Sequence, residues 1–73
     1  METEFRLRGE HVALCDLLKL TGIAHSGGQG KQMIAGGEVT VDGQPESRKT
    51  AKIRAGQIVR CLGQSVQVLA AET

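Results

Sequence analysis

The fold is decided by the stretch Gly22-Ile23-Ala24-His25-Ser26-Gly27-Gly28-Gln29-Gly30-Lys31-Gln32-Met33-Ile34-Ala35-Gly36-Gly37-Glu38-Val39-Thr40-Val41-Asp42-Gly43. It predicts a loop, a short helix, a glycine stop, a strand and a tight turn, in that order. Ser26 is a preferred N-cap residue, and Gln29 stands three positions on, as a capping box requires. Gly36-Gly37 should end the helix, because glycine adopts positive φ at no steric cost. Asp42-Gly43 is a strong signal for a two-residue hairpin turn.

The helix predicted over Ser26 to Ala35 carries glycine at positions 27, 28 and 30, where alanine would suit a helix better. Glycine in a helix interior costs about 1 kcal/mol relative to alanine. One explanation is that another backbone or a ligand approaches the bare main chain. A helix start collects unpaired N–H groups and partial positive charge, which suit an anion such as phosphate. The other explanation is a weak helix held only by packing, and the glycines alone favour neither.

Size and composition favour a surface-binding module over an enzyme. A chain of 73 residues buries only a thin core. One Phe and no Tyr or Trp leave an aliphatic core with little room for an enclosed substrate pocket. We therefore expect a single domain over residues 1–73, with its core at about 10–70 and frayed termini, and no catalytic residues.

Charge is divided unevenly along the chain, although the net charge is only +1. Residues Met1 to Glu46 hold four basic and seven acidic side chains, whereas Ser47 to Ala71 hold five basic and no acidic ones. Such asymmetry can indicate a nucleic-acid or membrane surface. The alternative is a solvated strand edge that Lys and Arg protect from aggregation.

Motifs for metals and nucleotides fail on spacing. Cys15 and Cys61 share no CxxC or CxH spacing; they could pair if close in space, but without a signal peptide they are interpreted as reduced core thiols. His11 and His25 have no partner at metal-ligand spacing, so no metal or cofactor is expected. Gly-Gly-Gln-Gly-Lys does not complete a phosphate loop, because His25 and Gln32 stand where Gly and Ser/Thr are required. No membrane-length apolar run or leader peptide is apparent, so we expect a soluble, cytoplasmic protein.

Periodicity predicts an α+β fold with two short N-terminal helices packed on a small antiparallel sheet of about four strands. The expected elements are an optional strand around Phe5, helices over 10–20 and 26–35, a strand at Val39, an irregular edge strand with Pro45, a basic loop over 49–54 anchored by Ile53, and strands over 58–62 and 65–69 joined at Gly63-Gln64. Pro45 should lie at an edge because proline cannot donate to a sheet ladder.

Several of these pieces together resemble a known family. The run Asp16-Leu17-Leu18-Lys19-Leu20-Thr21-Gly22-Ile23-Ala24, then Ser26, Lys31 and Ile34, then Gly37-Glu38-Val39-Thr40-Val41-Asp42-Gly43, is similar to the RNA-binding domain named for small-subunit ribosomal protein S-four, also called the alpha-L motif. The close of that motif is matched by Lys52-Ile53 and Ala55-Gly56-Gln57-Ile58. The similarity covers about Val12 to Leu62, so the chain looks like a small stand-alone member.

The resemblance implies that the start of the second helix and the adjoining loop bind structured RNA, of a ribosomal or tRNA-like kind. The candidate RNA-binding residues are Lys19, His25, Ser26, Gly27, Gly28, Lys31, Gln32, Arg48, Lys49, Lys52 and Arg54. Gly27 and Gln32 stand where members often have Arg or Lys, so the basic loop would supply the missing charge. His25 is either an ordinary loop residue or a contact to phosphate or base.

The resulting prediction is a non-enzymatic, monomeric RNA-binding protein that reads RNA shape through one basic face. Phe5 is the only ring besides the histidines, which disfavours single-strand recognition by stacking. No membrane or small-molecule partner is expected, and the resemblance leaves room for a ribosomal or RNA-processing protein partner. The alternative is a protein-interaction module whose basic loop binds an acidic partner. The RNA hypothesis requires the glycine-rich helix start and the basic loop to share one face.

Overall fold

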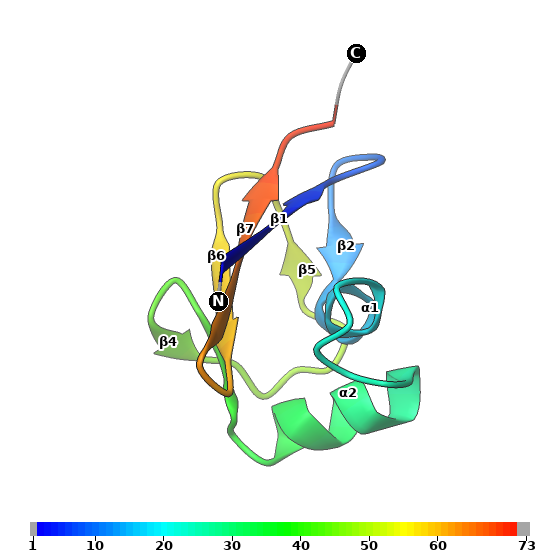
Figure 1. Cartoon of the computed structure of the whole chain (residues 1–73), viewed down its shortest axis with the longest axis vertical. Coiled ribbons are helices and arrows are strands. Elements are labelled where there is room, and N and C mark those ends of the chain that lie inside the picture. Colours follow the sequence, from blue (N-terminus) through cyan, green and yellow to red (C-terminus); the bar gives the residue numbers. More distant parts are fainter. Residues whose placement is uncertain (1, 72–73) are drawn as a thin grey trace.

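The computed structural model describes residues 2–71 and places two helices against a five-stranded sheet (Figure 1). The elements are β1 (Glu2–Arg6), β2 (Val12–Ala13), α1 (Leu14–Leu20), α2 (Gly27–Ala35), β3 (Val39–Val41), β4 (Gln44–Pro45), β5 (Lys52–Ile53), β6 (Ile58–Cys61) and β7 (Gln64–Leu69). Met1, Glu72 and Thr73 lie outside the described residues, and the predicted fraying of the termini therefore stays a prediction there.

The α+β class and the two-helix arrangement are confirmed, but the sheet is mixed rather than antiparallel. Its strand order is β1-β7-β6-β3-β4, and β1 runs parallel to β7. The remaining neighbours in this sheet are antiparallel. The optional N-terminal strand is therefore present, and it pairs the N-terminal part of the chain with the C-terminal strand. A second ribbon pairs β2 with β5.

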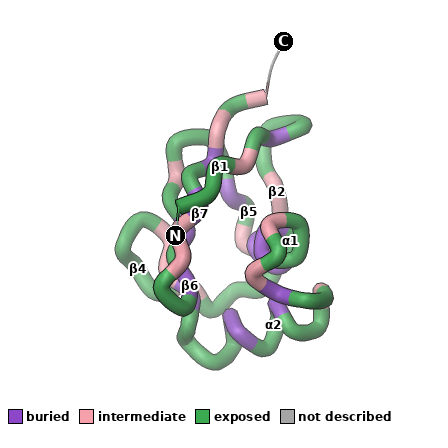
Figure 2. The backbone as a smooth tube through the Cα atoms, viewed as in Figure 1, coloured by how far each residue is buried: buried purple, intermediate pink, exposed green. Residues whose placement is uncertain are grey.

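The core lies between the inner face of the sheet and the helices, as the burial colours in Figure 2 show. Alternating strand residues point inward, so β6 buries Val59 and Cys61 and exposes Ile58 and Arg60. The largest fully buried side chains are aliphatic: Leu14, Leu17, Leu18, Ile34, Ile53, Val39, Val59, Val66 and Val68. The prediction of an aliphatic core is confirmed, with both free cysteines buried in it.

Helix α2 begins and ends where its sequence predicts. Ser26 is the N-cap, and its hydroxyl oxygen accepts a hydrogen bond from the Gln29 N–H at 3.1 Å. At the other end Gly37 adopts φ 78° and donates to the Ile34 carbonyl, while Glu38 donates to the Met33 carbonyl. These two bonds form a Schellman motif, which satisfies the last carbonyls of the helix.

Helix α1 begins at Leu14, not at Glu10, so that part of the helix prediction was wrong. Val12 and Ala13 form β2 instead and pair with β5. The N–H groups at the start of α1 are satisfied from the neighbouring loop, because Leu14 donates to the Ala51 carbonyl at 2.9 Å. A tertiary pairing thus replaces the first helical turn, and local periodicity cannot reveal it.

Two hairpin turns have left-handed residues at both central positions. Asp42 and Gly43 adopt φ 52° and 84°, which confirms the predicted turn between β3 and β4. The β6–β7 turn lies at Leu62 and Gly63, with φ 52° and 77°, and not at Gly63-Gln64 as predicted. Leucine is an unusual residue for this conformation, which explains the one-residue error.

Asp42 also ties its turn to the start of β6. Its carboxylate accepts a hydrogen bond from the Ile58 N–H at 2.9 Å and another from the Gln57 amide at 3.5 Å. We expect Asp42→Ala to lower the free energy of unfolding by about 1–2 kcal/mol, because an N–H loses its acceptor and alanine tolerates positive φ poorly. Asp42→Asn keeps an oxygen acceptor and should cost less. Urea denaturation measures both; equal midpoints for wild type and Asp42→Ala would contradict this role.

The segment between β3 and β6 is more regular than predicted. Gln44–Pro45 forms the edge strand β4, which confirms the expected place of Pro45. Lys52–Ile53, predicted as part of a loop, is strand β5, and Ile53 is buried as expected. No helix within residues 2–71 has the length and apolar character needed to span a bilayer.

Candidate nucleic-acid interface

The start of α2 is held in place by a variant of the capping box. Gln29 donates its N–H to the Ser26 hydroxyl, and its side-chain oxygen accepts from the N–H of His25, one residue before the N-cap. In the usual box this second bond goes to the N-cap residue itself. Both bonds are local, so the conformation of His25 and Ser26 is set before any ligand arrives, while both side chains remain exposed.

The three glycines of α2 have different structural roles. A Cβ at Gly30 would lie 3.1 Å from the Cys15 carbonyl oxygen, so glycine at this position permits close contact between α2 and the backbone of α1. Nothing lies within 4 Å of a Cβ at Gly27, and only the Ser26 hydroxyl is near one at Gly28. Packing therefore explains Gly30, whereas Gly27 and Gly28 leave the first turn of α2 uncovered.

The basic loop and α2 both contact the main chain of the same residue of α1, Cys15. The N–H of Cys15 donates to the Lys49 carbonyl at 3.0 Å, and the carbonyl of the same residue faces Gly30. Figure 1 shows the chain between β4 and β5 passing α1 at the end of the molecule where α2 lies. Two segments that are some twenty residues apart in the sequence therefore both approach the main chain of Cys15.

Lysine side chains supply most of the uncompensated charge here. Lys31, Lys49 and Lys52 are exposed, and no carboxylate of residues 2–71 forms an ion pair with them. Arg48 differs, because its guanidinium binds the Glu46 carboxylate at 2.9 Å. The Arg48 side chain is 81% exposed, so this pair is worth at most about 1 kcal/mol and can be exchanged for a phosphate. Glu46 was not among the residues predicted for the site, and its position two residues before Arg48 was the only signal of this ion pair in the sequence.

The remaining predicted residues are less closely grouped. Lys19 is exposed in the last turn of α1, about 6 Å along the helix axis from Cys15 at 1.5 Å per residue. Gln32 is exposed on α2. Arg54 follows β5, and its N–H donates to the side chain of Gln57, which in turn contacts Asp42. Arg54 therefore lies near the β3–β4 turn, and strand β5 separates it from Lys49 in the sequence.

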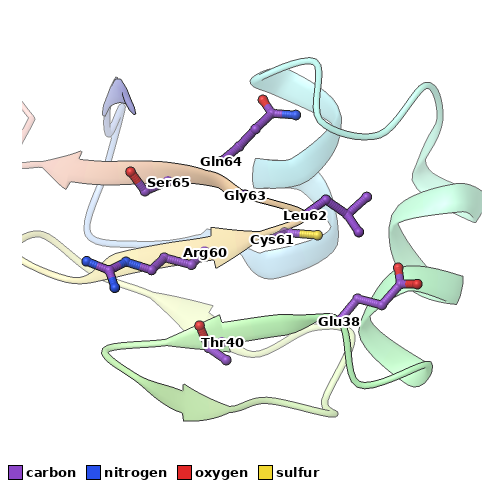
Figure 3. A pocket seen from close by; sticks show the side chains of 8 residues that line it. All are labelled: Glu38, Thr40, Arg60, Cys61, Leu62, Gly63, Gln64 and Ser65. Atoms are coloured by element: carbon purple, nitrogen blue, oxygen red, sulfur yellow. The ribbon is translucent and has the colours of Figure 1, made fainter. Parts of the chain in front are cut away.

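A shallow depression of about 440 Å³ lies elsewhere, on the β3, β6 and β7 side of the molecule (Figure 3). Thr40, Arg60 and Ser65 lie side by side across the three strands, and Glu38 lies at the other end. One arginine and one glutamate leave this depression without a concentration of either charge. It offers an anion much less than the exposed lysines Lys31, Lys49 and Lys52 do.

The environment of Cys61 disfavours a thiolate. Burial, and secondly the Glu38 carboxylate, raise the pKa of the Cys61 thiol above its ordinary value. Cys61 therefore stays protonated and lacks the thiolate character of a nucleophile. Within residues 2–71 no group of three or more His, Cys, Asp or Glu side chains is placed to hold a metal ion.

The chain matches a protein-family model, named bacterial proteins and a solved structure. The family model described as "S4 domain" matches residues 5–69. The chain is 60% identical over 60 residues to the Escherichia coli (strain K12) protein named "Putative RNA-binding protein YbcJ", covering 82% of this chain and 86% of that protein. A protein of Shigella flexneri, named "Uncharacterized protein YbcJ", matches equally well. The solution structure of YbcJ from E. coli, described as revealing an alpha-L motif involved in RNA binding, superimposes with a TM-score of 0.74 at 55% identity, covering 93% of this chain and 87% of that one.

Proposed function

Because this chain belongs to the S4 domain family, we propose that it is an RNA-binding protein that recognises structured RNA through the start of α2 and the loop leading into β5. The named relative and the solved structure are both described in terms of RNA binding, which supports the general function. The face, the kind of RNA and the residues are our own assignment. The RNA is ribosomal or tRNA-like, and the protein acts without catalysis of its own.

One observation carries this proposal: Cys15 contacts both Gly30 and Lys49 through its main chain. This supports one face made of the first turn of α2 and three exposed lysines, Lys31, Lys49 and Lys52, which have no acidic partner in the described part of the chain. Backbone N–H groups and lysines position phosphates but read no base sequence, so recognition rests on RNA shape. The only Phe, Phe5, lies in β1, and the two helices and the basic loop carry no aromatic platform for stacked bases.

The proposed interface consists of the candidate residues that the sequence predicts, and we assign them different roles in binding RNA. Lys31, Lys49 and Lys52 supply the charge, and Arg48 joins them once phosphate replaces Glu46. His25, Ser26, Gly27 and Gly28 present the helix start, while Lys19, Gln32 and Arg54 lie at the margin. We further propose that residues 1–73 act as one RNA-binding domain, as a monomer in the cytoplasm. A ribosomal or RNA-processing protein is the partner class that fits such a role.

Salt dependence tests the phosphate contacts. If about four phosphates are bound, each contributing a slope of about −0.7 to −0.9, a fourfold rise in salt should weaken binding roughly a hundredfold. Fluorescence anisotropy with a folded RNA hairpin at two salt concentrations measures this. A single strand of the same composition is the control and should bind more weakly. An affinity for the hairpin that does not change with salt would contradict the proposal.

A further inference from the structure

A second surface feature is a groove of about 390 Å³ between the end of β1, the β1–β2 connection and the last turn of α1. Figure 1 shows the β1–β2 connection at the opposite end of the molecule from α2. No residue of this groove belongs to the proposed RNA interface. Apart from Gly9, the residues that line it are Phe5, Val12, Leu20, Arg6, Arg8 and His11.

The floor of the groove is apolar. Phe5 and Val12 are half-buried and pack against the core, so their positions are fixed from below. Leu20 stands beside them with 62% of its surface exposed, although it lies in a seven-residue helix whose other leucines are fully buried. The exposed leucine beside the fixed aromatic ring provides apolar surface that an apolar partner can bury.

The rim of the groove is basic. Arg8 and His11 are exposed on the β1–β2 connection. The Arg6 guanidinium donates to the Ala70 carbonyl at 3.0 Å, which fixes this side of the rim. Glu10 lies in the same connection, but neither Glu10 nor any other acidic residue in the described part of the chain lines the groove. The complement of this surface is a segment that is acidic and apolar at once.

We propose that this groove docks an acidic amphipathic segment of a protein partner. Apolar side chains of the segment cover Phe5, Val12 and Leu20, and its carboxylates pair with Arg8 and accept a hydrogen bond from the His11 ring. An RNA strand fits less well, because two of the three floor residues are aliphatic and offer no face on which bases stack. Lys52 pairs with Ala13 beside the groove, but the β1–β2 connection and α2 lie at opposite ends of the molecule, so a segment in the groove leaves the start of α2 open to RNA.

The test uses the full chain, isotope-labelled, and a synthetic peptide of sequence Glu-Leu-Asp-Phe-Glu-Leu-Asp-Leu. We expect amide shifts confined to residues 5–12 and Leu20. A peptide with lysine in place of every acidic residue should produce none. Leu20→Lys and Arg8→Glu should each weaken binding about tenfold, because one removes apolar contact and the other reverses a rim charge.

Matched controls separate the groove from general surface effects. Leu62 is 65% exposed in the β6–β7 turn, and Arg60 is exposed on β6, so Leu62→Lys and Arg60→Glu repeat the same chemical changes elsewhere. Both should bind the peptide as the wild type does. Absence of binding, shifts outside the groove, or equal losses in the controls would overturn the proposal. So would a single-stranded or folded RNA that shifts the groove amides at lower concentration than the peptide.

Discussion

Replacing Lys31 and Lys49 together by glutamate should weaken binding of a folded RNA hairpin by at least about a hundredfold at 50 mM salt. Each phosphate contact contributes about −0.8 to the slope of log affinity against log salt, so it raises the affinity at 50 mM salt roughly tenfold over that at 1 M. Losing two such contacts therefore lowers the affinity roughly a hundredfold. The new carboxylates add repulsion. The magnitude of the slope of log affinity against log salt should also fall by about 1.6. Anisotropy titrations at several salt concentrations give both quantities.

A matched double reversal checks that position matters and not net charge. Arg8→Glu with Arg60→Glu changes the total charge by the same amount, at exposed arginines on the β1–β2 connection and on β6. This variant should retain most of its RNA affinity and most of its salt slope. Equal losses in the two double variants would mean that RNA responds to overall charge, and no defined face could then be assigned.

The second large effect is on stability. Gly30→Val should lower the free energy of unfolding by about 2 kcal/mol or more, because the added carbons must displace the backbone of Cys15. The displacement would also separate α2 from the loop held by Cys15, so RNA affinity should fall with it. Urea denaturation followed by circular dichroism measures the loss of stability.

Two substitutions calibrate this result. Gly30→Ala combines a helix-propensity gain of up to about 1 kcal/mol with a milder clash. Its free energy of unfolding should therefore lie between those of Gly30→Val and wild type. Gly27→Ala adds its methyl group where nothing lies within 4 Å, and it should be neutral or slightly stabilising. If Gly30→Val were as stable as Gly27→Ala, the close contact between α1 and α2 would be unimportant.

Local signals predicted the parts of the fold that are locally determined. The Ser26 cap, the Gly37 stop and the Asp42-Gly43 turn each depend on a few neighbouring residues, and the structure has all three. The parallel pairing of β1 with β7 joins residues more than sixty positions apart, and no short-range pattern encodes it. The start of α1 was misplaced for the same reason, because β5 competes for Val12 and Ala13.

The candidate site was predictable in part. The uneven charge and the glycines in α2 pointed to the two segments, but sequence could not show that they both contact Cys15. It also could not tell the packed Gly30 from the open Gly27, since both are glycines near a helix start. Burial depends on what the rest of the chain places opposite, and that information appears only with the tertiary structure.

Amide chemical-shift mapping of the full chain with a folded RNA hairpin tests the shared RNA-binding face most directly. We predict that residues 25–32 and 48–52 shift together and saturate at the same RNA concentration, because both segments approach the main chain of Cys15 and, in our proposal, form one face. The groove residues 5–12 should remain unchanged. Shifts in only one of the two segments, or in neither, would contradict the existence of a shared RNA-binding face.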